Sequence, residues 1–321
     1  MKNQMIKTKL LINIQPVLLA LSATLLAGTA HGQLFVSNYG YGGGFGSIGE
    51  YATSGTTVNA NLISGTGPAY GLTLDGNGNL FSANPSTGTI GEYTTSGATV
   101  NASLISGLSE PEGLALDGNG NLFVLNYASG TIGEYTTSGA TVNASLISGL
   151  GNAFELTLDG NGNLFVANYG ANDIGEYTIS GGVVVSSNPS IISGLSSPIS
   201  LSLDGNGNLF ELNVGNGTIG EYTTSGATVN ANLISGLSGG PEGLALDGNG
   251  NLFVANSGSG TISEYTTSGA TVNADLISGL STPTALAIEP APEPSTSVLA
   301  GAGMLALLAF KKFRNTASSK Y

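Results

Sequence analysis

The chain contains no cysteine and no tryptophan, and its seven Lys and Arg residues all lie near its two ends. Between residues 33 and 310 there is no Lys, Arg or His. A nucleophile activated by histidine, a lysine Schiff base and a zinc site built from His or Cys are therefore excluded from this segment. The segment also lacks the cationic contacts that supply most of the affinity for nucleic acid. We expect neither a nucleic-acid partner nor a disulfide.

All twenty Asp and Glu residues lie in the same segment, which is therefore strongly acidic. Its potential ligand atoms are carboxylate, amide, hydroxyl and carbonyl oxygens. Such hard oxygen ligands suit calcium or magnesium. We therefore expect either no cofactor or one of these two cations.

The N-terminus has the order of a secretory signal. Three lysines, Lys2, Lys7 and Lys9, precede an apolar run over residues 10–26, and small residues follow up to residue 32. A positive start, an apolar centre and small residues at the end are typical of a cleavable signal peptide. We assign residues 1–32 to it, with an uncleaved anchor helix as the alternative, and expect the protein to be exported.

The C-terminal tail, residues 290–321, has three parts. Pro292, Glu293 and Pro294 precede an apolar segment over residues 297–310, and a basic cluster follows. The apolar segment is short for a membrane-spanning helix, which needs about 20 residues, and the basic end favours the cytoplasmic side. This tail resembles the PEP-CTERM sorting signal. The resemblance implies an exosortase-type partner, transient anchoring in the inner membrane by a helix at 297–310, cleavage near the motif, and delivery to the cell surface or extracellular matrix. A plain membrane anchor is the alternative.

Between these ends the sequence repeats. Leu-Asp-Gly-Asn-Gly-Asn-Leu-Phe occurs five times, with its Asp at positions 75, 117, 159, 204 and 247. A repeat of about 40–45 residues is typical of a four-stranded propeller blade. One unit reads as strands at residues 113–116, 122–125, 131–135 and 141–147, joined by turns rich in Gly and Asn.

The ends of the repeat array are complementary. Residues 33–38 match the second strand of the unit, and residues 285–289 match the first. Pairing of residues 285–288 with residues 34–37 would close a ring and remove exposed strand edges. The sequence predicts an all-β fold, a six-bladed β-propeller over residues 33–289, with a β-solenoid as the alternative. The unit at residues 241–256 resembles NHL-type and gluconolactonase-like propeller blades, but this resemblance concerns the fold, since propellers host many unrelated functions.

Three features recur in every unit or nearly every unit. The Asp-Gly-Asn-Gly-Asn turn lacks the Gly and Glu positions of an EF-hand-type calcium loop, so we interpret it as a hairpin turn. A Glu-Tyr pair in the third strand places one side chain on each face, and either the Tyr or the Glu packs between blades. An Asn ends each second strand, where it suits a cap that bonds local backbone.

The start of the first strand is where the units differ chemically. The aligned residues are Tyr70, Glu112, Phe154, Ile199, Glu242 and Thr284, with Glu155 directly after Phe154. In gluconolactonase-like propellers this position supplies metal ligands, so the resemblance implies a metal site at Glu112, Glu155 and Glu242. The acids here differ from the ligand set of that family, which puts the site in doubt.

Three functions stay open at this point. Near-identical blades favour a non-enzymatic surface or matrix protein, because a dedicated active site needs one blade to differ. The resemblance also allows a divalent-cation-dependent hydrolase or lyase that uses Glu112, Glu155 and Glu242. The aromatic residues Tyr70 and Phe154 favour a propeller that binds a glycan or protein, such as a matrix polysaccharide, at the channel mouth.

Overall fold

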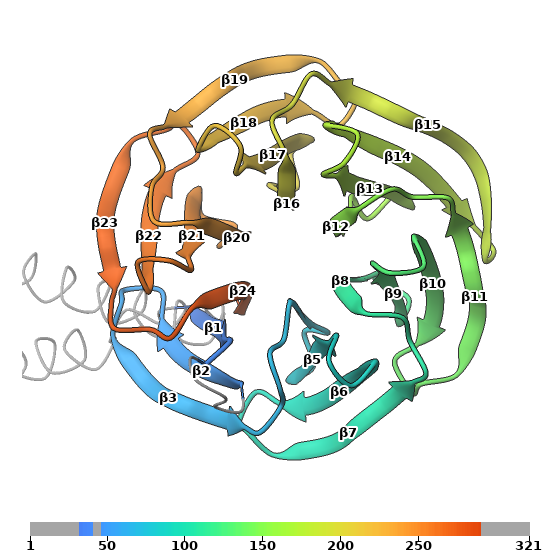
Figure 1. The fold of residues 1–321 in the computed structure, drawn as a ribbon, viewed down its shortest axis with the longest axis horizontal. Helices are drawn as coiled ribbons and strands as arrows, with labels where there is room; N and C mark the ends of the chain where they lie inside the picture. Colours follow the sequence, from blue (N-terminus) through green and yellow to red (C-terminus); the bar gives the residue numbers. More distant parts are fainter. Residues whose placement is uncertain (1–31, 41–45, 290–321) are drawn as a thin grey trace, which may run out of the picture. The chain divides into compact units, whose positions relative to one another are not determined.

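The computed structural model describes residues 32–40 and 46–289, which form twenty-four β-strands. The strands make six four-stranded sheets that stand as blades in a ring (Figure 1). No helix occurs in this described part, and hence none that could cross a membrane. The predicted signal peptide up to residue 31, the tail from residue 290 with its sorting motif, and the predicted helix at 297–310 lie outside the described residues.

Each blade runs from an innermost strand, a, through b and c to an outermost strand, d. The a strands are β4 (Gly71–Leu74), β8 (Pro111–Leu116), β12 (Ala153–Leu158), β16 (Pro198–Leu203), β20 (Pro241–Leu246) and β24 (Pro283–Glu289). The b strands are β1 (Gln33–Asn38), β5 (Asn79–Asn84), β9 (Asn121–Asn126), β13 (Asn163–Asn168), β17 (Asn208–Asn213) and β21 (Asn251–Asn256). The c strands are β2 (Ser47–Ala52), β6 (Thr89–Thr94), β10 (Thr131–Thr136), β14 (Asp173–Ser180), β18 (Thr218–Thr223) and β22 (Thr261–Thr266). The d strands are β3 (Thr57–Ser64), β7 (Thr99–Ser106), β11 (Thr141–Ser148), β15 (Val183–Ser193), β19 (Thr228–Ser235) and β23 (Thr271–Ile277). Blade 1 contains β24, β1, β2 and β3, and blades 2 to 6 follow in chain order.

The turn between strands a and b is built by its first aspartate. In blade 2, Asp75 Oδ1 accepts hydrogen bonds from the backbone N–H groups of Asn77 (2.8 Å) and Asn79 (3.0 Å). Asp75 Oδ2 accepts a third from Asn79 Nδ2 at 2.7 Å. Asp and Asn favour turns because their side chains bond backbone two residues on. The interpretation of this segment as a hairpin turn is confirmed.

The core lies in layers between neighbouring blades. Phe81 of strand b in blade 2 and Tyr135 of strand c in blade 3 belong to one cluster of buried side chains, and the other interfaces repeat this pattern. Burying each such ring stabilises the fold by about 1.5–3 kcal/mol. Of the two arrangements that the sequence left open, the tyrosines are the residues that pack between blades. The neighbouring glutamates do not simply face solvent, since Glu50 and Glu134 are buried and the others are half-buried.

The ring is closed by its two ends. Strand β24 pairs with β1 in an antiparallel ladder that places Leu34 opposite Ile288 and Phe35 opposite Ala287. Blade 1 therefore takes its innermost strand from the end of the array and its other three strands from the beginning. The predicted six blades and the predicted closing pair are confirmed, and the solenoid alternative is wrong.

Candidate functional site

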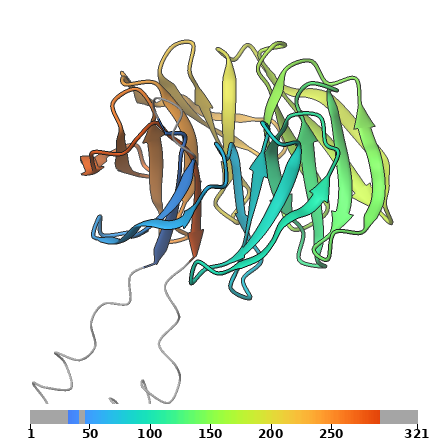
Figure 2. The same ribbon diagram turned by 60° about the horizontal axis from the view of Figure 1, so that its bottom comes forward.

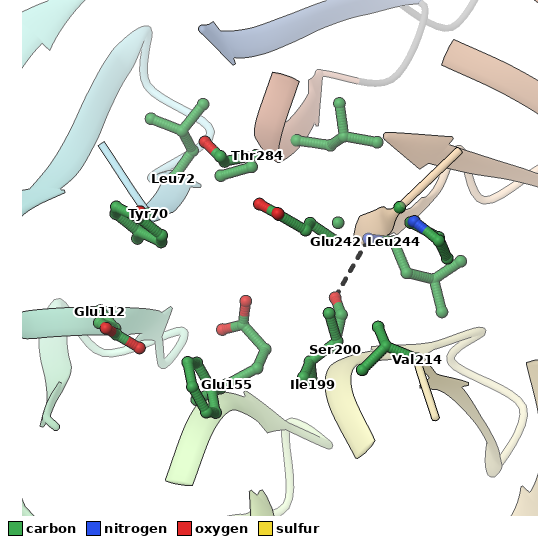
Figure 3. A pocket seen from close by; sticks show the side chains of 16 residues that line it. Tyr70, Leu72, Glu112, Glu155, Ile199, Ser200, Val214, Glu242, Leu244 and Thr284 are labelled. Atoms are coloured by element: carbon green, nitrogen blue, oxygen red, sulfur yellow. Dashed lines mark hydrogen bonds between the residues drawn. The ribbon is translucent and has the colours of Figure 1, made fainter. Parts of the chain in front are cut away.

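The six aligned residues at the starts of the a strands lie around one cavity of about 330 Å³. Each blade contributes one of these residues, so side chains that are far apart in sequence line the same cavity (Figure 3). The sequence predicted that these positions share a face, and this is confirmed. The set consists of Tyr70, Glu112, Phe154, Ile199, Glu242 and Thr284.

Hydrogen bonds between blades hold the mouth of this cavity. Ser200 Oγ of β16 accepts a bond from the backbone N–H of Leu244 in β20 at 3.1 Å. Thr284 Oγ1 of β24 donates to the carbonyl of Ala69, just before β4, at 2.9 Å. Both bonds are buried and join neighbouring blades, so the cavity is formed before any ligand arrives, as is usual for binding sites.

Three carboxyl groups line the cavity. Glu155 and Glu242 extend theirs into it, and Glu112 lies at its edge near Tyr70 (Figure 3). Glu155 Oε1 accepts a hydrogen bond from the backbone N–H of Leu156 at 3.1 Å, and Glu242 Oε1 accepts one from Ser257 Oγ at 2.8 Å. Glu112 Oε2 is buried and has no hydrogen-bond partner among the described residues.

Burial makes these acids weak. It raises the pKa of Glu112 to about 7, with nearby Glu110 adding to the effect. It raises the pKa of Glu155 to about 8; the Leu156 N–H opposes this shift, and Glu112 adds to it. The pKa of Glu242 is also raised by burial, against the hydrogen bond from Ser257. Glu155 is half-buried in the wall of the cavity, and its removal from bulk water dominates the shift in its pKa. Near neutral pH the site therefore both donates and accepts hydrogen bonds.

The three acids share the cavity without forming a metal-binding cluster. In the described part of the chain, no three His, Cys, Asp or Glu side chains lie close enough together to hold a metal ion. The unpartnered Oε2 of Glu112 is an available ligand atom, but six to eight oxygens are needed for calcium. A preformed metal site does not fit these residues as they lie. Binding of calcium or magnesium by Glu112, Glu155 and Glu242 stays a prediction.

Aromatic rings surround the cavity mouth in two groups. Tyr39 meets Tyr70 edge to face, with ring centroids 6.1 Å apart. Phe154 lies between Tyr127 and Tyr169, with centroid separations of 5.0 and 5.2 Å. Tyr39 and Tyr169 are exposed, so each group presents ring surface to solvent.

The sequence predicted Tyr70 and Phe154 at the mouth but missed Tyr39, Tyr127 and Tyr169. Each of these tyrosines directly follows the Asn that ends a b strand, at a position where the other three blades carry Pro, Val or Ser. Variation at this position could have identified the three tyrosines from sequence. The position lies beside the variable start of strand a, because strand b ends where strand a begins.

Two of the Asn residues that end the b strands bind backbone N–H groups through Oδ1, whereas Oδ1 of Asn38 and of Asn168 has no hydrogen-bond partner among the described residues. Asn213 Oδ1 accepts the backbone N–H of Ser196 at 2.7 Å, and Asn126 Oδ1 accepts that of Ser109 at 3.3 Å. The partners of Asn213 and Asn126 are both 17 residues away in sequence. All six Asn residues are buried. The predicted bonding to local backbone is found at Asn84 and Asn256, whose Nδ2 groups donate to the carbonyls of Ser82 and Val254 at 3.4 Å.

The fold and this cavity define a six-bladed β-propeller with a site at the mouth of its central channel. Residues 27–299 match the virginiamycin B lyase family, and the chain belongs to that family. A comparison with curated protein sequences gave no match.

Solved structures share the fold at low identity. A chain of a nidogen/laminin complex has a TM-score of 0.66 at 15% identity, over 81% of this chain and 99% of the other. Virginiamycin B lyase from Staphylococcus aureus has a TM-score of 0.53 at 20% identity, over 68% and 73%. A gluconolactonase from Xanthomonas campestris has a TM-score of 0.57 at 14% identity, over 70% and 83%. These likenesses establish the propeller architecture and leave function to the site.

Proposed function

We propose that the protein is an exported, non-enzymatic propeller that binds a carbohydrate of the extracellular matrix at its channel mouth. The observation that carries this proposal is where the blades differ. Their turns, b strands and c strands are nearly identical in sequence, whereas the residues around the mouth change from blade to blade.

The chemistry of the mouth suits a sugar. The C–H faces of a sugar ring pack against aromatic rings such as Tyr169 and Phe154, which supply large, rigid apolar surface. Its hydroxyl groups both donate and accept hydrogen bonds, which matches carboxyl groups held partly protonated. The absence of Lys and Arg from the body disfavours a phosphorylated or sulfated ligand.

Export and sorting belong to the same proposal. The predicted signal peptide and the tail at Pro292, Glu293 and Pro294 support passage across the inner membrane and processing by an exosortase-type enzyme. Mass spectrometry of the extracellular protein tests this. Peptides containing Phe313 should be absent from the mature form, and their recovery would refute removal of the tail.

A lyase or hydrolase is the second candidate, favoured by the family and by one observation. The pKa of Glu155, raised to about 8 by burial, places a carboxyl group near the range in which a general acid or base works best at neutral pH. No histidine is available beside it.

Two assays separate the candidates. The purified protein is applied to an array of bacterial polysaccharide fragments, and is separately incubated with virginiamycin B and with gluconolactone, each with calcium or magnesium. We expect retention on a subset of the fragments and no loss of either small molecule. Turnover of either compound above a buffer control would establish the enzyme instead.

A further inference from the structure

The outer hairpin of blade 4 is longer than those of the other blades. Strands β14 and β15 have 8 and 11 residues, whereas the c and d strands of blade 3 have 6 and 8. Two glycines with positive φ, Gly181 (61°) and Gly182 (74°), make its tight turn. The extra length places this turn beside the third and fourth strands of blade 3.

In the other blades the hairpin tip packs against the outer strand of the preceding blade. A Cβ placed on Gly139 of blade 3, for example, would lie 2.6 Å from the carbonyl oxygen of Leu104 in blade 2. At the tip of blade 4, a Cβ on Gly182 would lie 3.4 Å from Val142 Cγ1 in the outer strand of blade 3 and 3.6 Å from Glu134 Oε2 in its third strand. The carbonyl of Gly182 also accepts a hydrogen bond from Asn143 Nδ2 at 3.4 Å. The long hairpin thus covers Glu134.

A cavity of about 450 Å³ lies beneath this hairpin, between blades 3 and 4. We call it the hairpin cavity. The turns that join strands a and b line it, so it opens on the face opposite the channel mouth. Its polar side chains are those of Asp117, Asn119, Asn121, Glu134, Asn161 and Ser180.

Glu134 is the unusual member of this lining. Its side chain is 3% exposed, and its Oε2 has no hydrogen-bond partner among the described residues. The equivalent Glu176 of the next blade is only half-buried. Burial, and then the charge of Asp117, raise the pKa of Glu134. Leaving a buried carboxyl oxygen without a partner destabilises the fold, and a ligand that donates a hydrogen bond to it would remove that penalty.

The rest of the lining also accepts hydrogen bonds. The amide nitrogens of Asn119 and Asn121 donate to Asp117 Oδ2, at 3.4 and 2.8 Å, which leaves their amide oxygens as acceptors. No cationic side chain exists between residues 33 and 310 to satisfy these groups. The lining of the cavity therefore favours a positively charged ligand with many hydrogen-bond donors.

We propose that the hairpin cavity binds an amino sugar, whose ammonium group donates to Glu134 and whose hydroxyl groups donate to the amide oxygens around it. A bare metal ion is much smaller than the cavity, and no cluster of three acids is present in the described residues. A neutral sugar leaves the carboxyl group of Glu134 without a charged partner. Charge-assisted hydrogen bonds of the ammonium type are about twice as strong as neutral ones.

Calorimetry on the full exported protein tests this with matched ligands and matched variants. The disaccharide of glucosamine is compared with its N-acetylated form, which has the same ring skeleton without the charge, and with calcium chloride. The variant Glu134→Gln removes the carboxyl group under the long hairpin. Glu176→Gln makes the same change one blade further on, outside the cavity.

We expect the charged disaccharide to bind at least tenfold more tightly than the acetylated one. Glu134→Gln should reduce that affinity at least tenfold, whereas Glu176→Gln should leave it unchanged. A thermal melt of each variant separates lost binding from lost folding, and an unfolded Glu134→Gln is replaced by Glu134→Asp, which keeps the charge and should retain binding. Equal affinity for the two disaccharides, calcium binding that Glu134→Gln abolishes, no heat from the charged disaccharide, or an equal loss in both variants would overturn the proposal.

Discussion

At the scale of single residues, comparison of the six blades shows where one blade has an acidic residue at a position that is apolar in most others. Glu211 of β17 is fully buried at a position where four other blades carry valine. Its Oε2 accepts a hydrogen bond from Asn213 Nδ2 at 2.6 Å, and its Oε1 has no partner among the described residues. Burial raises its pKa to about 8, against the bond from Asn213. The acid is therefore mainly protonated at neutral pH.

Replacing Glu211 by valine should stabilise the protein in a pH-dependent way. A carboxyl group whose pKa is higher in the folded state than its ordinary 4.5 opposes folding increasingly as pH rises from about 4.5 to about 8. At about 1.4 kcal/mol per pH unit, this effect reaches about 3 kcal/mol at pH 7. Urea unfolding at pH 5, 7 and 8 measures it. The wild type should lose stability over this range relative to Glu211→Val.

The reverse substitution is the control. Val124→Glu places a carboxyl group at the same position of blade 3 and should confer the same loss of stability with rising pH. Parallel pH profiles for the wild type and Glu211→Val would show that Glu211 is not the group that titrates.

Calcium binding at the mouth is a prediction at the same scale. The acids Glu112, Glu155 and Glu242 line one cavity, and a divalent ion would relieve their mutual repulsion. Calorimetry with calcium should give weak binding that the double variant Glu112→Gln/Glu242→Gln loses. A cation needs ionised ligands, so affinity should rise from pH 6 to pH 8.5 as the raised pKa values are passed. Identical heats for the two proteins would place any binding elsewhere.

At the scale of elements, the repeat predicts the strands well and the loops poorly. The predicted strand at residues 113–116 begins two residues earlier, at Pro111. A proline lacks the N–H that a strand interior needs, but it is tolerated at the first residue of a strand. The aromatic contacts of the mouth, such as that between Tyr127 and Phe154, join neighbouring blades across loops. The sequence pattern of a single blade cannot predict such contacts between neighbouring blades.

The direction of side chains is the other limit. Sequence alignment of the blades predicted that Glu112, Glu155 and Glu242 share the channel, and they do. It could not predict that they stay apart there, because side-chain direction depends on bonds such as that between Ser257 and Glu242. The long hairpin of blade 4 appeared in the sequence only as a spacing of 45 residues instead of 42 or 43.

Strand β24 should contribute far more stability than its seven residues suggest. Removing it exposes the edge of β1 and opens the ring, so every blade interface loses the constraint of closure. A chain that ends after residue 281 is compared by thermal unfolding with one that ends after residue 290. We expect the shorter chain to lose its cooperative transition. A midpoint within about 5 °C of the longer chain would show that closure by β24 is unimportant.

At the scale of the whole molecule, the two ends of the propeller lie together. Gln33 of β1 is paired with Glu289 of β24, and the two strands lie side by side (Figure 2). Because a b strand begins at the turn that joins it to strand a, this pair lies at the face of those turns. The channel mouth is at the opposite ends of the same strands. Both ends of the described propeller therefore lie at the face away from the mouth.

The acidity of the body also acts at this scale. With every Lys and Arg outside residues 33–310, the propeller presents one sign of charge. Such a surface repels anionic polymers and attracts cations and cationic polymers, an effect that salt weakens beyond about 8 Å. A neutral carbohydrate at the mouth and an amino sugar in the hairpin cavity are both compatible with this field.

The central claim is that the variable mouth binds carbohydrate. Calorimetric titration of a fragment retained on the polysaccharide array tests it most directly, with the wild type beside Tyr127→Ala/Phe154→Ala/Tyr169→Ala. The control is Val58→Ala/Val100→Ala, which removes exposed apolar side chains from two outer strands. We expect the mouth variant to lose affinity at least tenfold while its thermal midpoint stays close to that of the wild type, and the control to bind normally. Unchanged affinity in the mouth variant, or an equal loss in the control, would contradict the account.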